Sequence, residues 1–119
     1  FTIVNSLDGY DEISLTSDFK VLSNYEETIY SPQEIGFPVV REQELYGGRG
    51  VEEAAEIFDR VLSNRATEAQ KNTVVVNAAF AIRTIDPNLS LENAIGQARE
   101  SIESGKAGKV FRKFVEINS

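Results

Sequence analysis

The chain of 119 residues contains no cysteine, no histidine and no methionine. Without cysteine it has no disulfide, no thiolate metal site and no cysteine nucleophile. Without histidine it lacks the most common general base and the most common metal ligand. No apolar run approaches the roughly 20 residues that cross a bilayer, so we expect no membrane-spanning helix. Any chemistry must therefore use carboxylates, hydroxyl groups, lysine, tyrosine or the backbone.

Acidic residues outnumber basic ones. The chain has 19 Asp and Glu residues against 12 Lys and Arg residues, which gives a formal net charge of −7 at neutral pH. This balance disfavours a nucleic-acid partner, because such a partner requires a basic surface. Hydrophobic residues make up 41% of the chain and charged residues 26%, as in ordinary globular domains. The length leaves room for one modest domain at most.

The chain begins inside the apolar stretch Phe1-Thr2-Ile3-Val4 instead of with methionine. No basic segment, long apolar segment or small-residue cleavage site follows, so we do not expect an uncleaved signal peptide. Two interpretations are open here: removal of the initiator methionine or a few disordered leading residues, or a fragment whose first strand lies in the middle of a fold. A strand this apolar usually has neighbours on both sides, which favours a fragment of a larger α/β domain.

Short strands are predicted in the first half of the chain. β-branched and aromatic residues mark three of them, and a polar break between the second and third predicts a hairpin. Ser31-Pro32-Gln33-Glu34 combines a capping residue, a proline at the first helical position and a glutamate three residues after the cap, which predicts one helical turn. Gly36 ends this turn, and residues 37–50 are expected to form a loop. The predicted strands are residues 1–4, 19–22 and 28–30.

Helices are predicted in the second half, where apolar residues recur at helical spacing. Residues 74–82 are apolar on nearly every side, so their helix is expected in the core. Pro87 ends that helix, and Ser90 caps the next one. Strands followed by about four helices give an α/β fold in a single partial domain, residues 1–119. The predicted helices are residues 51–64, 67–85, 90–105 and 106 onward.

The segment Asp8-Gly9-Tyr10-Asp11-Glu12 places three carboxylates directly after a predicted strand. Adjacent carboxylates on a loop, such as Asp11 and Glu12, can direct their oxygens to one point. Mg²⁺ uses one or two carboxylates and completes its shell with water and substrate phosphate oxygens. Ligands in α/β folds also tend to bind at the carboxyl ends of strands. We therefore take Asp11 and Glu12 as candidate magnesium ligands, with a solvated acidic turn as the alternative.

Three other features have both a functional and a structural interpretation. Gly47-Gly48-Arg49-Gly50 can cradle a phosphate at a helix start, but adjacent acidic residues favour a closely packed turn. Asn77 is a lone amide in an apolar helix; it binds a ligand or, as we favour, ties a loop backbone to the helix. Lys106, in Ser104-Gly105-Lys106-Ala107, neutralises a phosphate or, more commonly for its position, faces solvent near a helix end.

In this order and spacing, the motifs resemble the C-terminal part of the anthranilate phosphoribosyltransferases. Each motif alone is weak, but the ordered set is fairly specific, and Gly-x-Asp-Glu-Ile followed by Pro-x-x-x-Gly is its strongest part. The resemblance covers nearly the whole chain. It also implies a phosphoribosyltransferase or nucleoside phosphorylase-type α/β domain. The matching segments are Thr2-Ile3-Val4, Asp8 to Ser14, Ser31 to Phe37, Leu45 to Gly48, Val61-Leu62, Asn77-Ala78-Ala79, Leu91-Glu92-Asn93, Ala98-Arg99-Glu100 and Ser104 to Ala107.

The resemblance implies transfer of phosphoribosyl from phosphoribosyl pyrophosphate (PRPP) to the amine of anthranilate in tryptophan biosynthesis. Magnesium assists in this family, and Asp11 and Glu12 match the adjacent pair that helps to hold it. Magnesium is needed because pyrophosphate leaves with several negative charges while the ribose carbon becomes cation-like. The amine is already nucleophilic, so we assign no catalytic residue to this chain. The resemblance further implies a cytoplasmic homodimer without a membrane or nucleic-acid partner.

Two departures from the family limit the resemblance. Asn5-Ser6 stands where relatives often have a His-Gly pair, so the role of that pair is open. The family's glycine-rich pyrophosphate loop, its Lys-His-Gly-Asn-type segment and its helical domain are expected upstream of Phe1, and we therefore expect this chain to be inactive alone. The alternatives are a non-catalytic nucleotide- or nucleic-acid-binding relative and a fragment like pyrimidine nucleoside phosphorylase. The retained Asp11-Glu12 pair favours the transferase over both.

Overall fold

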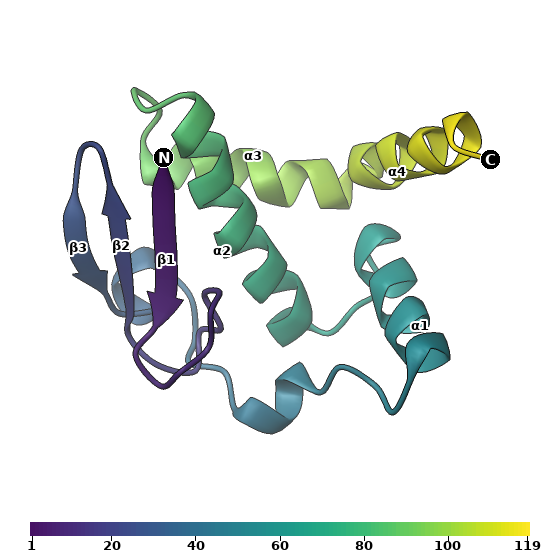
Figure 1. Cartoon of the computed structure of the whole chain (residues 1–119), viewed down its shortest axis with the longest axis horizontal. Coiled ribbons are helices and arrows are strands. Elements are labelled where there is room, and N and C mark those ends of the chain that lie inside the picture. The colour runs from purple at the N-terminus through teal and green to yellow at the C-terminus, as the bar shows by residue number, and fades with distance from the viewer.

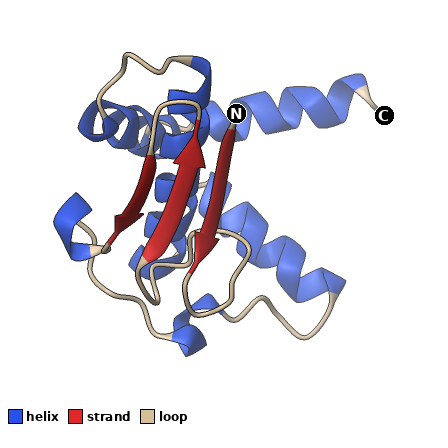
Figure 2. Cartoon of the chain, turned by 60° about the vertical axis from the view of Figure 1, so that its left-hand side comes forward, coloured by secondary structure: helices blue, strands red, loops and turns tan.

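The structure is a computed structural model that describes residues 1–119. It contains a three-stranded antiparallel sheet, two short 3-10 helices and four α-helices. Strand β1 (Thr2–Ser6) pairs with β2 (Phe19–Ser23), which pairs with β3 (Glu27–Tyr30). Helix α2 (Glu68–Ile85) passes beside the sheet (Figure 1), and the α-helices lie on one side of it (Figure 2). This arrangement confirms the predicted α/β class of short strands followed by four helices.

Strand β1 continues further than the sequence predicts. The strand was expected to end at residue 4, but Asn5 pairs with Lys20 and Ser6 pairs with Phe19 in the ladder with β2. Ser6 is only 2% exposed, and its hydroxyl forms hydrogen bonds with the residues that follow the strand. These bonds offset the cost of burying a hydroxyl. The polar composition of residues 5 and 6 therefore did not stop the strand.

The hairpin between β2 and β3 is confirmed. The backbone N–H of Ser23 donates to the carbonyl of Glu26 over 2.8 Å. The Ser23 hydroxyl accepts from the backbone N–H groups of Tyr25 at 3.1 Å and Glu26 at 3.2 Å. A serine side chain thus closes this turn, which explains why it forms without an Asn-Gly or Asp-Gly dipeptide.

The predicted single helical turn is the 3-10 helix η1 (Gln33–Ile35). The backbone N–H of Ser31 donates to the Glu34 carboxylate over 2.7 Å, and the N–H of Glu34 donates to the Ser31 hydroxyl over 3.3 Å. This reciprocal pair is the capping arrangement that the sequence indicated. Gly36 ends the turn with a φ angle of +90°, in the left-handed region that glycine tolerates best.

A second 3-10 helix, η2 (Glu42–Leu45), lies within the segment that we predicted to be a loop. Its start is closed by the backbone N–H of Arg41, which donates to the Glu44 carboxylate over 2.7 Å. The segment before it is held by the N–H of Val40, which donates to the carbonyl of Leu15 over 2.9 Å. Arginine is not a usual capping residue, so the sequence carried no clear signal for this turn.

The four α-helices lie where they were predicted. Thr67 caps α2 by accepting from the backbone N–H of Gln70 over 3.2 Å. Ser90 caps the following helix by accepting from the N–H of Asn93 over 3.1 Å. Gly105, with a φ angle of +82°, separates the last two helices. The helices other than α2 are α1 (Val51–Leu62), α3 (Leu91–Glu103) and α4 (Lys106–Ile117).

The core lies between the sheet and α2. Phe19 is fully buried; its ring stacks on Tyr30 with centroids 5.6 Å apart and meets Phe80 edge-on at 6.0 Å. Val74 of α2 is 40% exposed, so the expectation that residues 74–82 are buried on nearly every side was too broad. One face of the helix is buried instead. The buried residues of α2 are Asn72, Val75, Val76, Ala79 and Phe80.

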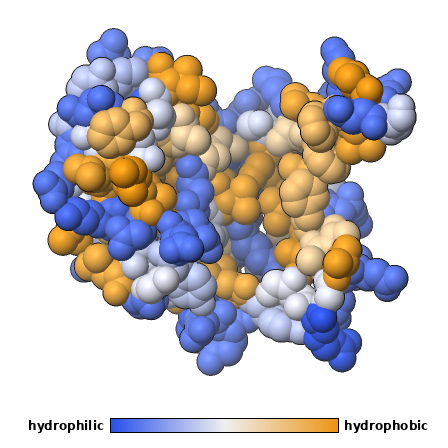
Figure 3. All heavy atoms as spheres, in the orientation of Figure 1, coloured by the Kyte–Doolittle hydropathy of each residue, from blue (hydrophilic) through white to orange (hydrophobic).

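Helices α1 and α4 leave most of their apolar surface exposed. The rings of Phe58 and Phe111 join the two helices with centroids 4.9 Å apart. Figure 3 shows hydrophobic surface on both sides of a hollow between these helices. The free edge of β1 also exposes Phe1 and Ile3. No helix has both the length and the apolar character for a membrane crossing. The large exposed apolar residues of α1 and α4 are Val51, Phe58, Val110, Phe111, Phe114, Val115 and Ile117.

Candidate functional site

Asp11 and Glu12 lie in the connection between β1 and β2, residues 7–18, directly after the carboxyl end of β1. Both side chains are exposed. Neither carboxylate takes part in an ion pair. The structure thus leaves both predicted carboxylates exposed and unpaired in the loop that follows β1.

Asp8 has a structural role in the same connection. Its Oδ2 accepts a hydrogen bond from the Thr16 hydroxyl over 2.5 Å, and its backbone N–H donates to the Ser17 hydroxyl over 3.3 Å. Gly9 follows with a φ angle of +110°, which permits the chain to turn sharply there. Of the three carboxylates in the motif, Asp8 therefore shapes the turn, while Asp11 and Glu12 face solvent.

The 3-10 helix η2 brings a further negative charge, the Glu42 carboxylate, close to Tyr10 in this loop. Partial burial raises the pKa of the Tyr10 phenol, and the nearby carboxylate of Glu42 raises that pKa further. Asp8 and Glu12 add smaller contributions in the same direction. The carboxylates of Asp8, Glu12 and Glu42 therefore create a locally negative potential, which favours a bound cation.

A series of hydrogen-bonded hydroxyl groups joins the loop to the end of β1. The Ser6 hydroxyl donates to the carbonyl of Glu12 over 2.8 Å and accepts from the backbone N–H of Ser14 over 3.0 Å. The Ser14 hydroxyl lies 2.9 Å from the Ser6 hydroxyl and 2.6 Å from that of Thr16. Thr16 in turn donates to Asp8. These contacts connect the end of β1 to both ends of the acidic motif.

Asn77 ties the same loop to α2. Its Oδ1 accepts from the backbone N–H of Ile13 over 3.0 Å, and its Nδ2 donates to the carbonyl of Ile13 over 2.7 Å. Nδ2 also donates to the carbonyl of Thr73, one turn earlier in the helix, over 2.8 Å. The favoured interpretation of Asn77, a lone amide that holds a loop backbone, is confirmed.

The exposed carboxylates of Asp11 and Glu12 are donors of the kind that Mg²⁺ uses in proteins. No group of three or more Asp, Glu, His or Cys side chains is arranged to enclose a metal ion. Mg²⁺ does not need such an enclosure, since it keeps several waters and uses one or two carboxylates together with substrate phosphates. Asp11 and Glu12 supply a donor set of this kind.

Residues 1–108 match the family model described as the glycosyl transferase family, a/b domain. This chain belongs to that family. The match includes the three strands, the acidic loop and helices α1, α2 and α3.

Similar proteins of the glycosyl transferase family include anthranilate phosphoribosyltransferases. Anthranilate phosphoribosyltransferase of Phocaeicola vulgatus is 56% identical over 119 residues, which are 100% of this chain and 36% of the relative. The chain thus spans little more than a third of the length of that relative. The solved anthranilate phosphoribosyltransferase of Thermus thermophilus has a TM-score of 0.87 and 25% identity, over 97% of this chain and 34% of the other.

Solved structures of anthranilate phosphoribosyltransferase from Saccharomyces cerevisiae share the fold of this family domain. The yeast protein in complex with PRPP and Mg has a TM-score of 0.78 and 22% identity, over 97% of this chain and 33% of the other. Its complex with 4-fluoroanthranilate has a TM-score of 0.81 and 21% identity, over 97% and 34%. At this level of identity the likeness concerns the fold.

The glycine-rich loop of this family domain is a closely packed turn. Gly48 has a φ angle of +93°, and a Cβ there would lie 2.8 Å from the Cβ of Glu53. The backbone N–H of Arg49 donates to one carboxylate oxygen of Glu53 over 2.5 Å, and its guanidinium lies 3.2 Å from the other. These bonds lower the pKa of the Glu53 carboxyl, the backbone bond contributing most. A protein carboxylate thus takes the place that a phosphate would need.

Substitution of Gly48 by alanine is expected to destabilise the glycosyl transferase domain by about 1–3 kcal/mol, because the new Cβ collides with α1 and the backbone angle suits glycine. Urea unfolding followed by circular dichroism measures the loss. Gly47→Ala is the matched control, since nothing lies within 4 Å of its Cβ position and its φ is not in the left-handed region. Equal losses in the two variants would contradict the packing argument.

Lys106 also has a local partner in the family domain. Its ammonium group lies 3.4 Å from a carboxylate oxygen of Glu100 in the preceding helix. Both side chains are mostly exposed. Gly105 provides the left-handed residue between the helices, as the sequence indicated. The structure therefore gives Lys106 the ordinary role of a solvated residue at a helix boundary.

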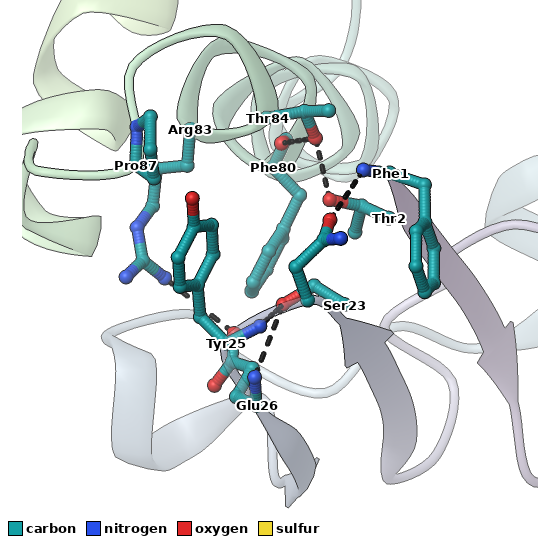
Figure 4. Close-up of a pocket in the computed structure, with 10 residues that line it drawn as sticks. Phe1, Thr2, Ser23, Tyr25, Glu26, Phe80, Arg83, Thr84 and Pro87 are labelled. Atoms are coloured by element: carbon teal, nitrogen blue, oxygen red, sulfur yellow. Dashed lines mark hydrogen bonds and ion pairs between the residues drawn. The ribbon is translucent and has the colours of Figure 1, made fainter.

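A polar cleft that the sequence did not reveal lies at the other end of the sheet, between the tip of the hairpin and the end of α2 (Figure 4). The hydroxyls of Thr2 and Thr84 lie 2.5 Å apart. The guanidinium of Arg83 lies 3.6 Å from the Glu26 carboxylate. The polar groups of the cleft thus bond to one another. The cleft lies at the opposite end of β1 from the loop that contains Asp11.

Proposed function

We propose that this chain is part of an anthranilate phosphoribosyltransferase, which transfers a phosphoribosyl group from PRPP to the amine of anthranilate and releases pyrophosphate. The observation that carries the proposal is the 56% identity along all 119 residues with a relative of that name. The free Asp11-Glu12 pair is consistent with it. The complexes of the yeast protein with PRPP and Mg and with 4-fluoroanthranilate support the same substrates.

In this proposal Asp11 and Glu12 hold a magnesium ion at the carboxyl end of β1. A bound magnesium ion supplies positive charge to the pyrophosphate as it leaves. The two carboxylates fix the position of that charge, and the loop beneath them limits how far they move. Their own negative charge, together with that of Glu42, favours a cation over an unaccompanied phosphate at this point.

The remaining parts of the reaction are assigned to the complete protein. The chain spans 36% of its relative, and we propose that the groups that bind ribose, pyrophosphate and anthranilate lie mainly outside it. We also propose that the complete protein is a cytoplasmic homodimer, as its resemblance to the family implies. The chain alone is expected to form no phosphoribosylanthranilate.

The test is an assay of a complete protein that carries this chain, with PRPP, Mg²⁺ and anthranilate. We expect anthranilate to be consumed only when PRPP and Mg²⁺ are both present, and chelation by EDTA to stop the reaction. The loss of anthranilate fluorescence provides the measurement. Absence of this activity, with phosphorolysis of a pyrimidine nucleoside in its place, would overturn the proposal in favour of a nucleoside phosphorylase.

A further inference from the structure

Two consecutive peptide groups after Glu12 are each held at both ends. The peptide between Glu12 and Ile13 has its carbonyl bound by the Ser6 hydroxyl at 2.8 Å and its N–H bound by Asn77 Oδ1 at 3.0 Å. The peptide between Ile13 and Ser14 has its carbonyl bound by Asn77 Nδ2 at 2.7 Å and its N–H bound by the Ser6 hydroxyl at 3.0 Å. Two side chains thus satisfy all four polar atoms of these peptides.

The two side chains come from rigid parts of the fold. Ser6 is buried at the end of β1, and Asn77 lies on α2, 64 residues after Ile13 in sequence. Asn77 is itself fixed by its hydrogen bond to the carbonyl of Thr73. Ile13 is fully buried in the core. The backbone is therefore fixed from the residue that follows the exposed pair, while the carboxylates themselves remain free.

We propose that Asn77 is a positioning residue for the metal ligands Asp11 and Glu12, acting through the Glu12–Ile13 peptide. This inference rests on the proposed function, because it requires that the two carboxylates hold a divalent cation. A loop that must be ordered when it binds a ligand loses conformational entropy at that step. By fixing the backbone in advance, the Asn77 amide removes part of this cost.

The inference predicts a specific loss of metal affinity. Removal of a group that orients a metal ligand typically lowers affinity by about 10- to 100-fold. Asn77→Ala is expected to weaken divalent-cation binding by a factor in this range. Mn²⁺ serves as the probe, since it suits the same carboxylate and water ligands as Mg²⁺. Its paramagnetism broadens the NMR signals of nearby backbone amides, so titration of a complete protein that carries this chain, with PRPP present to supply phosphate ligands, reports both the affinity and the location of the ion.

Asn72→Ala is the matched control. Asn72 is also a buried amide on α2, but its Oδ1 has no hydrogen-bond partner and it does not contact the loop through a hydrogen bond. We expect this variant to keep the affinity of the parent protein. Hydrogen exchange of the Ile13 amide is the second measurement: the amide should be protected in the parent and in Asn72→Ala, and exposed in Asn77→Ala.

The outcomes separate the inference from the function on which it rests. If Mn²⁺ does not broaden the signals around residues 11 and 12 in the parent protein, the metal assignment itself is overturned. If it does, and folded Asn77→Ala binds with parental affinity, only the positioning role is overturned. If Asn77→Ala does not fold, Asn77→Ser takes its place under the same criterion, because its side chain is polar and uncharged but too short to bond both peptide groups beside Ile13. Rapid exchange of the Ile13 amide in the parent would also overturn the positioning role.

Discussion

Replacement of Glu12 by glutamine in a complete enzyme that carries this chain is expected to lower kcat/KM for PRPP by about 100-fold or more. Glutamine keeps the size of the side chain and removes its negative charge. Charge stabilisation by a bound metal is worth several kcal/mol in a transition state, and about 1.4 kcal/mol corresponds to a factor of ten in rate. Asp11→Asn should act in the same direction, because its carboxylate is equally exposed and unpaired.

Asp18→Asn is the control for this experiment. Asp18 is an exposed acid in the same connection between β1 and β2, and its side chain has no hydrogen-bond or ion-pair partner. Its variant should keep the rate of the parent enzyme. Raising the Mg²⁺ concentration should restore part of the activity of Glu12→Gln, since the loss is one of metal binding. Unchanged kinetics in Glu12→Gln and Asp11→Asn would remove these residues from the magnesium site.

The largest expected effect on stability comes from Phe19→Ala, which should lower the free energy of unfolding by about 3–5 kcal/mol. The ring is fully buried at the point where β2 meets β3 and α2, and it contacts the rings of Tyr30 and Phe80. Its removal leaves a cavity that neighbouring aromatic rings fill poorly. Because domains of this size have only about 5–15 kcal/mol of stability in total, much of the chain population should lose its tertiary structure on mild heating.

Phe58→Ala provides the comparison for Phe19→Ala. Phe58 is 50% exposed, and its single aromatic contact is with Phe111 of α4. An aromatic pair of this kind is worth about 0.5–1.5 kcal/mol beyond area burial, so its loss should be clearly smaller than that of Phe19→Ala. Urea titration of both variants, followed by circular dichroism, distinguishes them. Similar losses would mean that the core is not centred on Phe19.

The sequence predicted the helices well because their signals are local. Thr67 and Ser90 sit at the caps, Pro87 ends α2 and apolar residues recur at a helical period, so each helix could be located without knowledge of the rest of the chain. The 3-10 helix η2 was missed because its start depends on Arg41 and Glu44, a pair that is not a common cap. Residues 5 and 6 were wrongly taken as a turn because their place in β1 depends on partners in β2.

Part of the candidate site could also be predicted from the sequence, because its signals are local. Asp11 and Glu12 are adjacent in sequence. The side chain of Asn77 was expected to bond to a loop backbone, since a lone polar residue in an apolar helix needs partners. The sequence did not say which loop Asn77 holds. The Ser6, Ser14 and Thr16 hydroxyls carried no recognisable pattern at all, because they meet only when the connection folds back over the end of β1.

The attachment of the acidic loop to Asn77 also affects the order in which the molecule can assemble. A contact between residues 64 positions apart forms late, because closing a long stretch of chain costs entropy before the contact is gained. Helical turns and the β2–β3 hairpin need no such closure. The backbone that follows Glu12 is therefore fixed only when α2 docks beside β1, and a chain with all its secondary structure in place would still lack this attachment.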